Sequence, residues 1–298
     1  MAPETAGGTD ATIDPARAIK DFLTTRRAKI TPQRVGLPSA GRRRVPGLRR
    51  EEVALLAGVS AEYYVQIERG QVGGVSEEVL GAVARALELD DVETAHLHDL
   101  VGAASGRPVR RRRTGASRTV PDGVRALLDA LVGAPAIVQN GRLDLLATNA
   151  LAAALYAPAL EDPEPNLARF VFLDDRAEEI FPAWERAADD VVALLQVEAA
   201  RNPDTAATTS LVGTLATRSE EFRVRWARHD VRAHRHGVKR FRHPLVGELS
   251  LRFEGLEPAG APGLTMIGYT PEPASVSEEA LRLLASWVTD PAPVERSP

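Results

Sequence analysis

A single glycine between two short amphipathic segments is the feature that most constrains the fold of this chain. In residues 49–57, apolar side chains recur at positions i, i+1 and i+4, which is the spacing of one helix face. These residues are Val53, Ala54 and Ala57. Gly58 follows at once and is suited to the positive φ of a tight turn. The pattern therefore predicts a helix that ends in a turn at Gly58.

The segment after this glycine carries the signals of a second helix that runs toward residue 70. Ser60 is a favoured N-cap residue, and Tyr64 and Ile67 at i and i+3 form an inward face. The outward face is left to Ala61, Glu62, Tyr63, Val65 and Gln66. Two short helices joined in this way indicate either a helix-turn-helix or an ordinary helical hairpin within an unrelated bundle.

A helix-turn-helix would make DNA the first partner to consider. Its second helix lies in the major groove, while its first helix crosses the phosphate backbone. Arg49 and Arg50, at the start of the first helix, fit the phosphate role. The loop upstream holds Arg42, Arg43 and Arg44. This loop is either a solvated linker or a phosphate contact, and beside such a helix we favour phosphate contacts.

The distribution of charge supports a nucleic-acid-binding region at one end of the chain. The formal net charge of the whole chain is −4. Residues 15–75 nevertheless hold 12 Lys and Arg against 5 Asp and Glu, a surplus of +7. Residues 119–298 hold 18 against 26, which leaves −8. The local field matters more for DNA binding than the total charge, so the split indicates one DNA-binding domain joined to a domain with another task.

Composition narrows the class of protein. A chain of 298 residues that is 44% apolar predicts two globular domains. We expect no membrane segment and no signal segment, and zero cysteines exclude disulfides and sulfur-ligated metal. A cytoplasmic protein is the simplest inference. The sequence shows no catalytic motif such as Gly-x-Ser-x-Gly or a phosphate-binding loop, so we expect no enzyme.

Histidines offer an alternative that involves a metal. His229, His234, His236 and His243 lie close together in the sequence. Zinc sites usually need three or four converging ligands with an oriented surrounding shell, and nothing else here has such spacing. We therefore expect no metal and no other cofactor.

The pattern along the chain predicts five segments. They are a disordered N-terminus (1–13), an all-α five-helix DNA-binding domain (14–103), a flexible basic linker (104–119), a ligand-binding domain (120–288) and a C-terminal tail (289–298). Within the first domain we expect helices near residues 15–28, 49–57, 60–70, 76–87 and 92–101.

The pattern changes after residue 120 to strands, then helices, then strands. Strands are expected at 136–139, 142–147, 238–243, 247–253 and 264–269, and helices at 123–131, 150–156, 166–171, 182–200, 208–217 and 219–227. Asn140 and Gly141 between two apolar runs predict a hairpin. The order indicates an α+β domain with a roughly five-stranded antiparallel sheet and helices over one face.

The two halves resemble two known families. Residues 49–70, with the capped helix at 76–87, resemble the repressor-like helix-turn-helix domains of the xenobiotic-response-element family over residues 15–103. This resemblance implies that Arg50 contacts phosphate. It also places six residues at base-facing or groove-edge positions: Ser60, Ala61, Glu62, Tyr63, Val65 and Gln66.

The second half resembles the ligand-binding domain of MmyB-like regulators, a PAS-like module of actinobacterial transcription factors. The resemblance rests on residues 143–149, 166–172, 182–184, 226–231 and 237–247 and covers 120–287. It implies a fatty-acid-like ligand between the sheet and the helices. Thr148 stands where many relatives have Trp, which would widen or reshape the pocket.

Eight residues are candidates to line that pocket: Asn149, Phe170, Phe172, Trp184, Arg223, Trp226, His229 and Arg240. The aromatic rings fit either core packing or pocket walls. His229 could orient a carboxylate, or it could form a structural pair with Asp230 that caps a helix. Four arginines could neutralise a carboxylate or lie solvated at the surface, namely Arg223, Arg225, Arg240 and Arg242.

These inferences describe a homodimeric transcriptional regulator that binds a double-stranded DNA operator and senses a small hydrophobic ligand. Dimerisation follows from the half-site geometry of helix-turn-helix proteins. The alternative is a DNA-binding regulator whose C-terminal domain serves only dimerisation or protein interaction.

Overall fold

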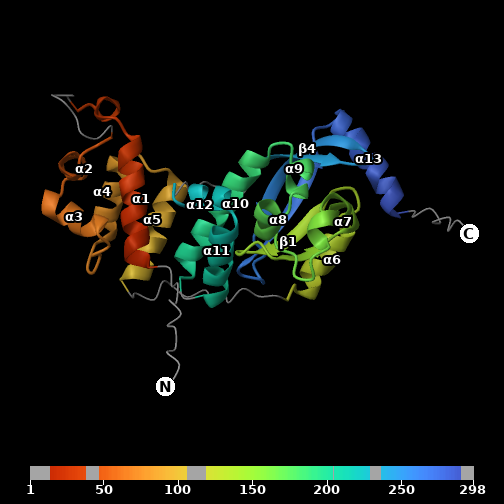
Figure 1. The fold of residues 1–298 in the computed structure, drawn as a ribbon, viewed down its shortest axis with the longest axis horizontal. Helices are drawn as coiled ribbons and strands as arrows, with labels where there is room; N and C mark the ends of the chain where they lie inside the picture. Colours follow the sequence, from red (N-terminus) through yellow and green to blue (C-terminus); the bar gives the residue numbers. More distant parts are fainter. Residues whose placement is uncertain (1–13, 38–46, 106–118, 204, 229–235, 290–298) are drawn as a thin grey trace, which may run out of the picture. The chain divides into compact units, whose positions relative to one another are not determined.

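The computed structural model describes residues 14–37, 47–105, 119–203, 205–228 and 236–289 (Figure 1). Backbone contacts divide the chain into two compact units, each with its own core. Several predictions fall outside the described residues: the N-terminal disorder, the loop with Arg42, Arg43 and Arg44, most of the linker and tail, and His229 with Asp230.

Within the described residues of 14–105 the first unit contains five α-helices and one short 3-10 helix, and residues 197–217 also belong to this unit. The helices within 14–105 are α1 (Pro15–Lys29), η1 (Pro32–Val35), α2 (Arg50–Ala57), α3 (Ala61–Glu68), α4 (Glu77–Ala86) and α5 (Asp91–Ala104). Four of the helices begin at a side-chain cap that accepts a hydrogen bond from a backbone N–H of the first turn, at Asp14, Ser60, Ser76 and Asp90. The predicted all-α five-helix domain is confirmed.

Helix α1 supplies much of the core of this unit. Its side chains Ile19, Phe22 and Leu23 have no exposed surface, and the helix contacts α3 and α5. Full burial of each such side chain contributes roughly 1.5–3 kcal/mol relative to exposure. Helix α2 contacts both α3 and α4, so the two helices next to Gly58 are fixed to a shared core.

The second unit contains a five-stranded antiparallel sheet, as predicted. Its strands are β1 (Ala136–Asn140), β2 (Leu145–Thr148), β3 (His236–His243), β4 (Gly247–Leu256) and β5 (Leu264–Pro271). The spatial order is β2-β1-β5-β4-β3, so β3 forms one edge. The first hairpin forms, but β2 begins later than residue 142. The reason is Asn140, whose Oδ1 accepts hydrogen bonds from the backbone N–H groups of Arg142 (3.0 Å) and Asp144 (3.1 Å) and holds the intervening residues in a loop.

The strands alternate between a buried and an exposed face. In β4, Leu249, Leu251 and Phe253 are buried, whereas the residues between them are exposed. In the neighbouring β3, Phe241 pairs with Leu249 and Lys239 pairs with Leu251. Lys239 therefore projects on the same face as the buried leucines and phenylalanines.

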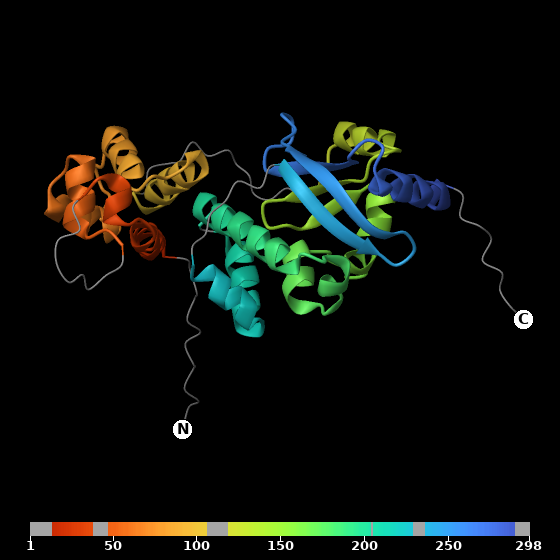
Figure 2. The same cartoon turned by 90° about the horizontal axis from the view of Figure 1, so that it is seen from above.

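Helices pack on both faces of the sheet, among them α6, α7, α9 and α13. The helices after residue 120 are α6 (Asp122–Ala130), α7 (Ala150–Leu155), η2 (Ala157–Leu160), α8 (Leu167–Leu173), α9 (Arg176–Ile180), α10 (Trp184–Arg201), α11 (Ala206–Arg218), α12 (Glu220–Trp226) and α13 (Val276–Thr289). Residues 197–217, which hold the end of α10 and most of α11, belong to the first unit. Leu128 of α6 packs with Val138 and Met266, whose side chains project away from the Leu251 face. Figure 2 shows the sheet between α6 and the green helices α8 and α9.

Two helices of this unit were not expected from the sequence. Helix α9 has only five residues and contacts β3. Helix α13 packs against α7 and β4 through the buried side chains of Leu281 and Leu284. A capping signal for α13 was present, since Ser275 Oγ accepts a hydrogen bond from the backbone N–H of Glu278 (3.2 Å).

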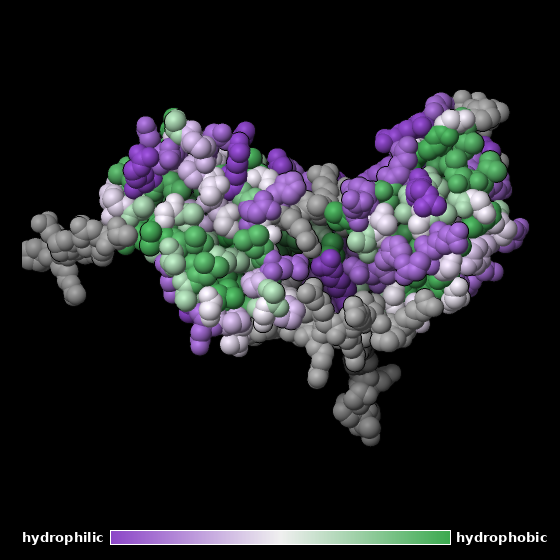
Figure 3. Space-filling view, turned by 180° about the vertical axis from the view of Figure 1, so that it is seen from behind, coloured by the Kyte–Doolittle hydropathy of each residue, from purple (hydrophilic) through white to green (hydrophobic). Residues whose placement is uncertain are grey.

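Both units expose single large apolar side chains. Leu55 in α2 is 70% exposed, Val132 after α6 is 73% exposed and Val276 in α13 is 79% exposed. In the space-filling view of Figure 3, hydrophobic areas are interspersed with hydrophilic ones. Single exposed apolar residues are common on folded proteins and identify no interface by themselves.

Candidate DNA-binding helix and ligand cavity

The turn between α2 and α3 has the geometry that the sequence predicts. Gly58 adopts φ 68°, and the backbone N–H of Val59 donates to the carbonyl oxygen of Ala54 (3.0 Å). Glycine satisfies this left-handed helix end without steric cost. Ser60 Oγ then accepts a hydrogen bond from the backbone N–H of Tyr63 (3.1 Å), which starts α3.

Helix α3 buries one face and presents the other. Tyr64 and Ile67 have no exposed surface, whereas Glu62 and Gln66 are exposed. Ala61, Tyr63 and Val65 are partly exposed. The predicted division into faces is therefore confirmed, and the assignment of the outward residues and Ser60 to base contacts stays a prediction.

A buried carboxylate at the end of α3 joins three helices. Glu68 is 1% exposed and accepts hydrogen bonds from Arg50 Nε (2.9 Å), Thr24 Oγ1 (2.8 Å) and Arg27 Nη2 (3.2 Å). Burial by itself would raise the pKa of Glu68. The bonds from Arg50 and Thr24 and the charge of Arg27 outweigh it, so the pKa lies below its ordinary value. The sequence analysis did not identify Glu68 as the centre of this network.

This network constrains the arginines that were assigned to phosphate contacts. One edge of the Arg50 guanidinium is bound to Glu68, but its side chain is still 51% exposed. Arg49 is exposed, and its backbone N–H donates to Glu52 Oε2 (2.6 Å) at the start of α2. The side chain of Arg50 and the backbone of Arg49 are thus held at the beginning of α2, and both guanidinium groups are exposed, as a phosphate contact requires.

Six aromatic residues form a cluster against the sheet. It contains Tyr156, Phe170, Phe181, Phe241, Phe253 and Tyr269. The ring centroids of Tyr156 and Phe241 are 5.4 Å apart, and the hydroxyls of Tyr156 and Tyr269 share a hydrogen bond of 2.7 Å. Burial raises the pKa of both tyrosines above the ordinary value. Of the predicted ligand residues, only Phe170 belongs to this cluster.

A second cluster lies among the helices α8, α10 and α12. It contains Phe172, Trp184, Phe222 and Trp226. Trp184 Nε1 donates to the carbonyl oxygen of Val171 (2.9 Å). Phe222 stacks on Trp226, with the two ring centroids 5.4 Å apart. The structure therefore divides the predicted aromatic ligand residues between two clusters, and in both of them the rings pack on one another.

The predicted polar ligand residues also separate. Asn149 is buried, and its amide group makes four hydrogen bonds. Its Oδ1 accepts from the backbone N–H groups of Ala136 and Ala152, and its Nδ2 donates to the carbonyl oxygens of Leu131 and Ala134. These bonds fix the loop before β1 to the start of α7. Arg223 is exposed and pairs with Glu220, while Arg240 lies beside a cavity.

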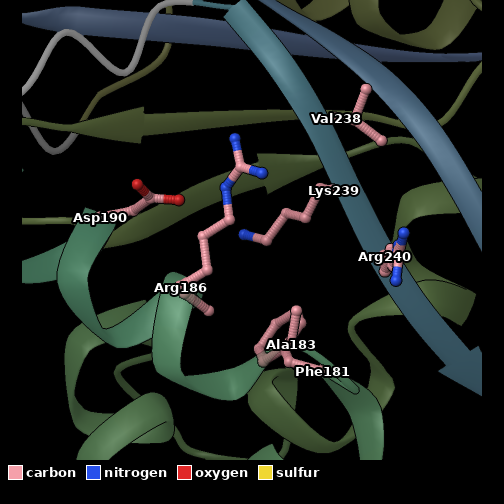
Figure 4. A pocket seen from close by; sticks show the side chains of 8 residues that line it. Phe181, Ala183, Arg186, Asp190, Val238, Lys239 and Arg240 are labelled. Atoms are coloured by element: carbon pink, nitrogen blue, oxygen red, sulfur yellow. The ribbon is translucent and has the colours of Figure 1, made fainter.

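That cavity, of about 410 Å³, lies between β3 and the start of α10 (Figure 4). Its size is within the range of small-molecule sites. The lining residues are Phe181, Ala183, Arg186, Ala187, Asp190, Val238, Lys239 and Arg240. Lys239 extends from β3 toward Arg186 and Asp190, whereas Val238 and Arg240 point to the other side of the strand.

Lys239 is not among the ligand residues predicted from the sequence. The available signal was its register, since Lys239 lies two residues before Phe241 on the buried face of an alternating strand. A lysine at such a position is unusual because its charge must leave water. Arg186 and Asp190 are four residues apart in α10 and thus lie on one side of that helix.

Family comparisons agree with this two-part structure. The model of the MmyB-like transcription regulator ligand binding domain matches residues 120–284, more than half of the chain. The chain belongs to the MmyB-like transcription regulator family. A helix-turn-helix domain model matches residues 25–97. A search of curated proteins gave no match.

These matches confirm the predicted architecture of an MmyB-like regulator with an N-terminal helix-turn-helix of the xenobiotic-response-element type. The families indicate a DNA-binding regulator rather than an enzyme. Among the described helices of this MmyB-like regulator, none has the length and apolar character that a membrane span needs. Its described residues also contain no cluster of three or more His, Asp or Glu that could hold a metal ion.

Proposed function

We propose that this MmyB-like regulator binds a specific double-stranded operator as a homodimer and that a small hydrophobic, fatty-acid-like ligand changes its operator affinity. The observation that supports this most is that one chain joins a preorganised helix-turn-helix to a ligand-binding domain with a cavity of about 410 Å³. Because the operator is intracellular DNA, we also place the protein in the cytoplasm.

The chemistry of α3 supports both general and selective DNA contacts. The amide of Gln66 can bond to adenine in a bidentate manner, and the carboxylate of Glu62 can accept from cytosine. Ala61 and Val65 offer apolar contact to thymine methyl groups. Few polar side chains of α3 can contact bases. Much of the affinity would therefore come from phosphate contacts by Arg49 and the loop arginines upstream.

A homodimer follows from how such helices read operators. Two helix-turn-helix domains bind half-sites about one helical turn apart, so the operator mirrors the two-fold symmetry of the protein. The roughly palindromic operator expected here can be selected from random DNA with the full-length chain. Selected sequences that lack paired half-sites would contradict the dimer.

The ligand response is tested with the full-length protein and that selected operator. Operator affinity is measured at fixed salt with and without dodecanoate, kept below its micelle concentration. A coupled ligand typically changes affinity by about 5- to 150-fold. Extraction of the purified protein with organic solvent, followed by mass spectrometry, should recover an acyl chain.

Two results would contradict the sensor. They are an operator affinity that dodecanoate leaves unchanged, and repeated extraction that yields no acyl chain. Both together would favour a C-terminal domain that serves dimerisation or protein interaction alone. An unselected DNA duplex of equal length is the control for non-specific effects of the added fatty acid.

A further inference from the structure

The ammonium group of Lys239 lies beside aromatic rings at the wall of the cavity, and the residue is partly exposed. Its Nζ is 4.8 Å from the ring centroid of Phe181, 5.7 Å from that of Tyr156 and 5.9 Å from that of Phe241. Rings at these distances attract a cation through their electron-rich faces. The three rings belong to the chain after α9, the end of α7 and β3 itself, so they fix the ammonium from several sides.

This ammonium has no hydrogen-bond acceptor among the described residues. Among those residues it lies near the three rings and the negative charge of Asp190. An ammonium carries three donors, and because Lys239 is partly exposed, these donors are open to water or to a ligand in the cavity. Burial of most of the side chain lowers the pKa of Lys239 to about 8, and Asp190 only partly opposes this shift.

The remaining lining gives the cavity a positive balance and an apolar wall. Arg186 and Lys239 together outnumber Asp190 among the charged side chains that point into the cavity. Phe181 and Ala187 are almost fully buried and provide the apolar surface. A ligand that matches this lining carries one negative charge at one end and hydrocarbon at the other.

We propose that the cavity between β3 and α10 binds an amphipathic monocarboxylate whose carboxylate pairs with Lys239. Arg186 supplies a second positive charge at the rim, and the hydrocarbon lies along Phe181 and Ala187. This assignment rests on the proposed ligand response and specifies which residues recognise the charged end. The sequence suggested Arg223 and Arg240 as partners of the carboxylate. In the structure Arg223 is paired with Glu220, and the side chain of Arg240 points to the other side of β3.

The first test compares two probes with the same hydrocarbon chain, dodecanoate and dodecan-1-ol. Binding to the full-length protein is measured by calorimetry at pH 7, below the micelle concentration. A hydrogen-bonded ion pair contributes enough to separate the two affinities by at least about tenfold. We expect Lys239→Met to reduce the affinity for dodecanoate to that for the alcohol, and Arg186→Gln to reduce it by a smaller factor.

Arg252→Gln is the matched control, because it removes a positive charge from an exposed residue of the neighbouring strand β4 that does not line the cavity. Its affinity for dodecanoate should stay within about twofold of the wild type. Circular dichroism establishes that each variant is folded. If Lys239→Met does not fold, Lys239→Arg and Arg186→Gln take its place.

The pH dependence of dodecanoate affinity distinguishes a lysine that binds the carboxylate from one that only supports the fold. Dodecanoate affinity should fall as pH rises above about 8, where Lys239 loses its proton. Lys239→Arg should retain affinity to about pH 10. Burial raises the pKa values of Tyr156 and Tyr269 and lowers that of His243, which moves the titration of these neighbours away from that range.

The outcomes separate the two proposals. Equal binding of dodecanoate and dodecan-1-ol, or full carboxylate preference in Lys239→Met, would overturn the anion site while the ligand response remained. Loss of preference in Arg252→Gln but not in Lys239→Met would place the site outside this cavity and also overturn it. Absence of binding by both probes would overturn the anion site and contradict the proposed fatty-acid response as well.

Discussion

The two units hold a charged side chain in their interior in opposite ways. In the helix-turn-helix unit, the carboxylate of Glu68 is 1% exposed and accepts hydrogen bonds from Arg50, Arg27 and Thr24. In the sheet unit, the ammonium of the partly exposed Lys239 lies beside three aromatic rings at a cavity wall, and no described residue accepts a hydrogen bond from it. A charged group whose hydrogen bonds are all made within the protein, such as the Glu68 carboxylate, stabilises the fold. A charged group without such bonds, such as the Lys239 ammonium, is available to bind a ligand.

The largest effect expected from this comparison is the loss of the Glu68 carboxylate. Glu68→Gln removes the negative charge that holds Arg27 and Arg50, which leaves Arg27, at 12% side-chain exposure, without its ionic partner. Breaking such a buried pair costs about 3–5 kcal/mol. Amide hydrogen exchange in α1, α2 and α3 should therefore accelerate, since it reports the stability of this unit alone.

Acid provides a second check on Glu68. A carboxylate whose pKa is lowered in the folded state contributes stability above its unfolded pKa and loses it as pH falls through the folded pKa. The difference in stability between wild type and Glu68→Gln should thus begin to shrink only below the ordinary glutamate pKa of about 4.3 and vanish as pH falls through the lower folded pKa. Glu62→Gln in the same helix is exposed and should stay within about 0.5 kcal/mol of wild type. An equal loss in Glu62→Gln would show that net charge, rather than the buried network, sets the stability.

Two glycines of the same unit should differ in what an added methyl group costs. Gly58 and Gly70 both have positive φ, at 68° and 77°. A Cβ at Gly58 meets open space, whereas one at Gly70 would lie 2.5 Å from the Cα of Ala16 in α1. Gly58→Ala should cost about 1–2 kcal/mol, and Gly70→Ala about 2–4 kcal/mol because the backbone must also move. Thermal unfolding of the two variants measures this difference. Equal losses of stability would mean that α1 moves away from the added methyl group at no cost.

The ammonium of Lys239 should destabilise the folded protein, whereas the carboxylate of Glu68 stabilises it. Its pKa is lowered to about 8 in the folded protein, while an unfolded lysine titrates near about 10.4. Between these values the unfolded chain binds more protons, so stability rises with pH by about 1–3 kcal/mol. Lys239→Met should remove this rise and be at least as stable as wild type at pH 7. Urea unfolding from pH 7 to 10 tests it, and identical pH slopes in the two proteins would place the ammonium in water.

The sequence predicts the helix-turn-helix unit well because its signals are local. The caps at Ser60 and Ser76 and the turn at Gly58 each depend on residues within a few positions, and all three form as expected. The network at Glu68 was not predicted, because Thr24 and Arg27 lie more than forty residues away in the chain. A contact over that separation leaves no spacing pattern to recognise.

In the sheet unit the strands were predictable but the cavity was not. Alternation of Leu249 and Leu251 with polar residues identifies a one-sided strand, and the structure confirms it. Which helix covers Lys239 depends on the path of the chain from α8 to α10, and α9 was too short to predict. The aromatic residues chosen from the resemblance separated into two clusters for the same reason. Pairing between distant elements, rather than local pattern, decides which rings meet.

The smallest effects concern DNA binding. Here the exposed side chains of α2 and α3 should divide into those that contact phosphates and those that contact bases. Arg49→Ala should weaken binding by a similar factor for every DNA sequence and lower the slope of log affinity against log salt by about one, because one phosphate contact is lost. Gln66→Ala should leave that slope unchanged and alter the preference among operators by about 1–3 kcal/mol at one base pair. Both side chains are exposed, so neither change should unfold the unit. Fluorescence anisotropy with several operators across a salt series separates the two, and a sequence-dependent effect of Arg49→Ala would assign that arginine to base contacts instead.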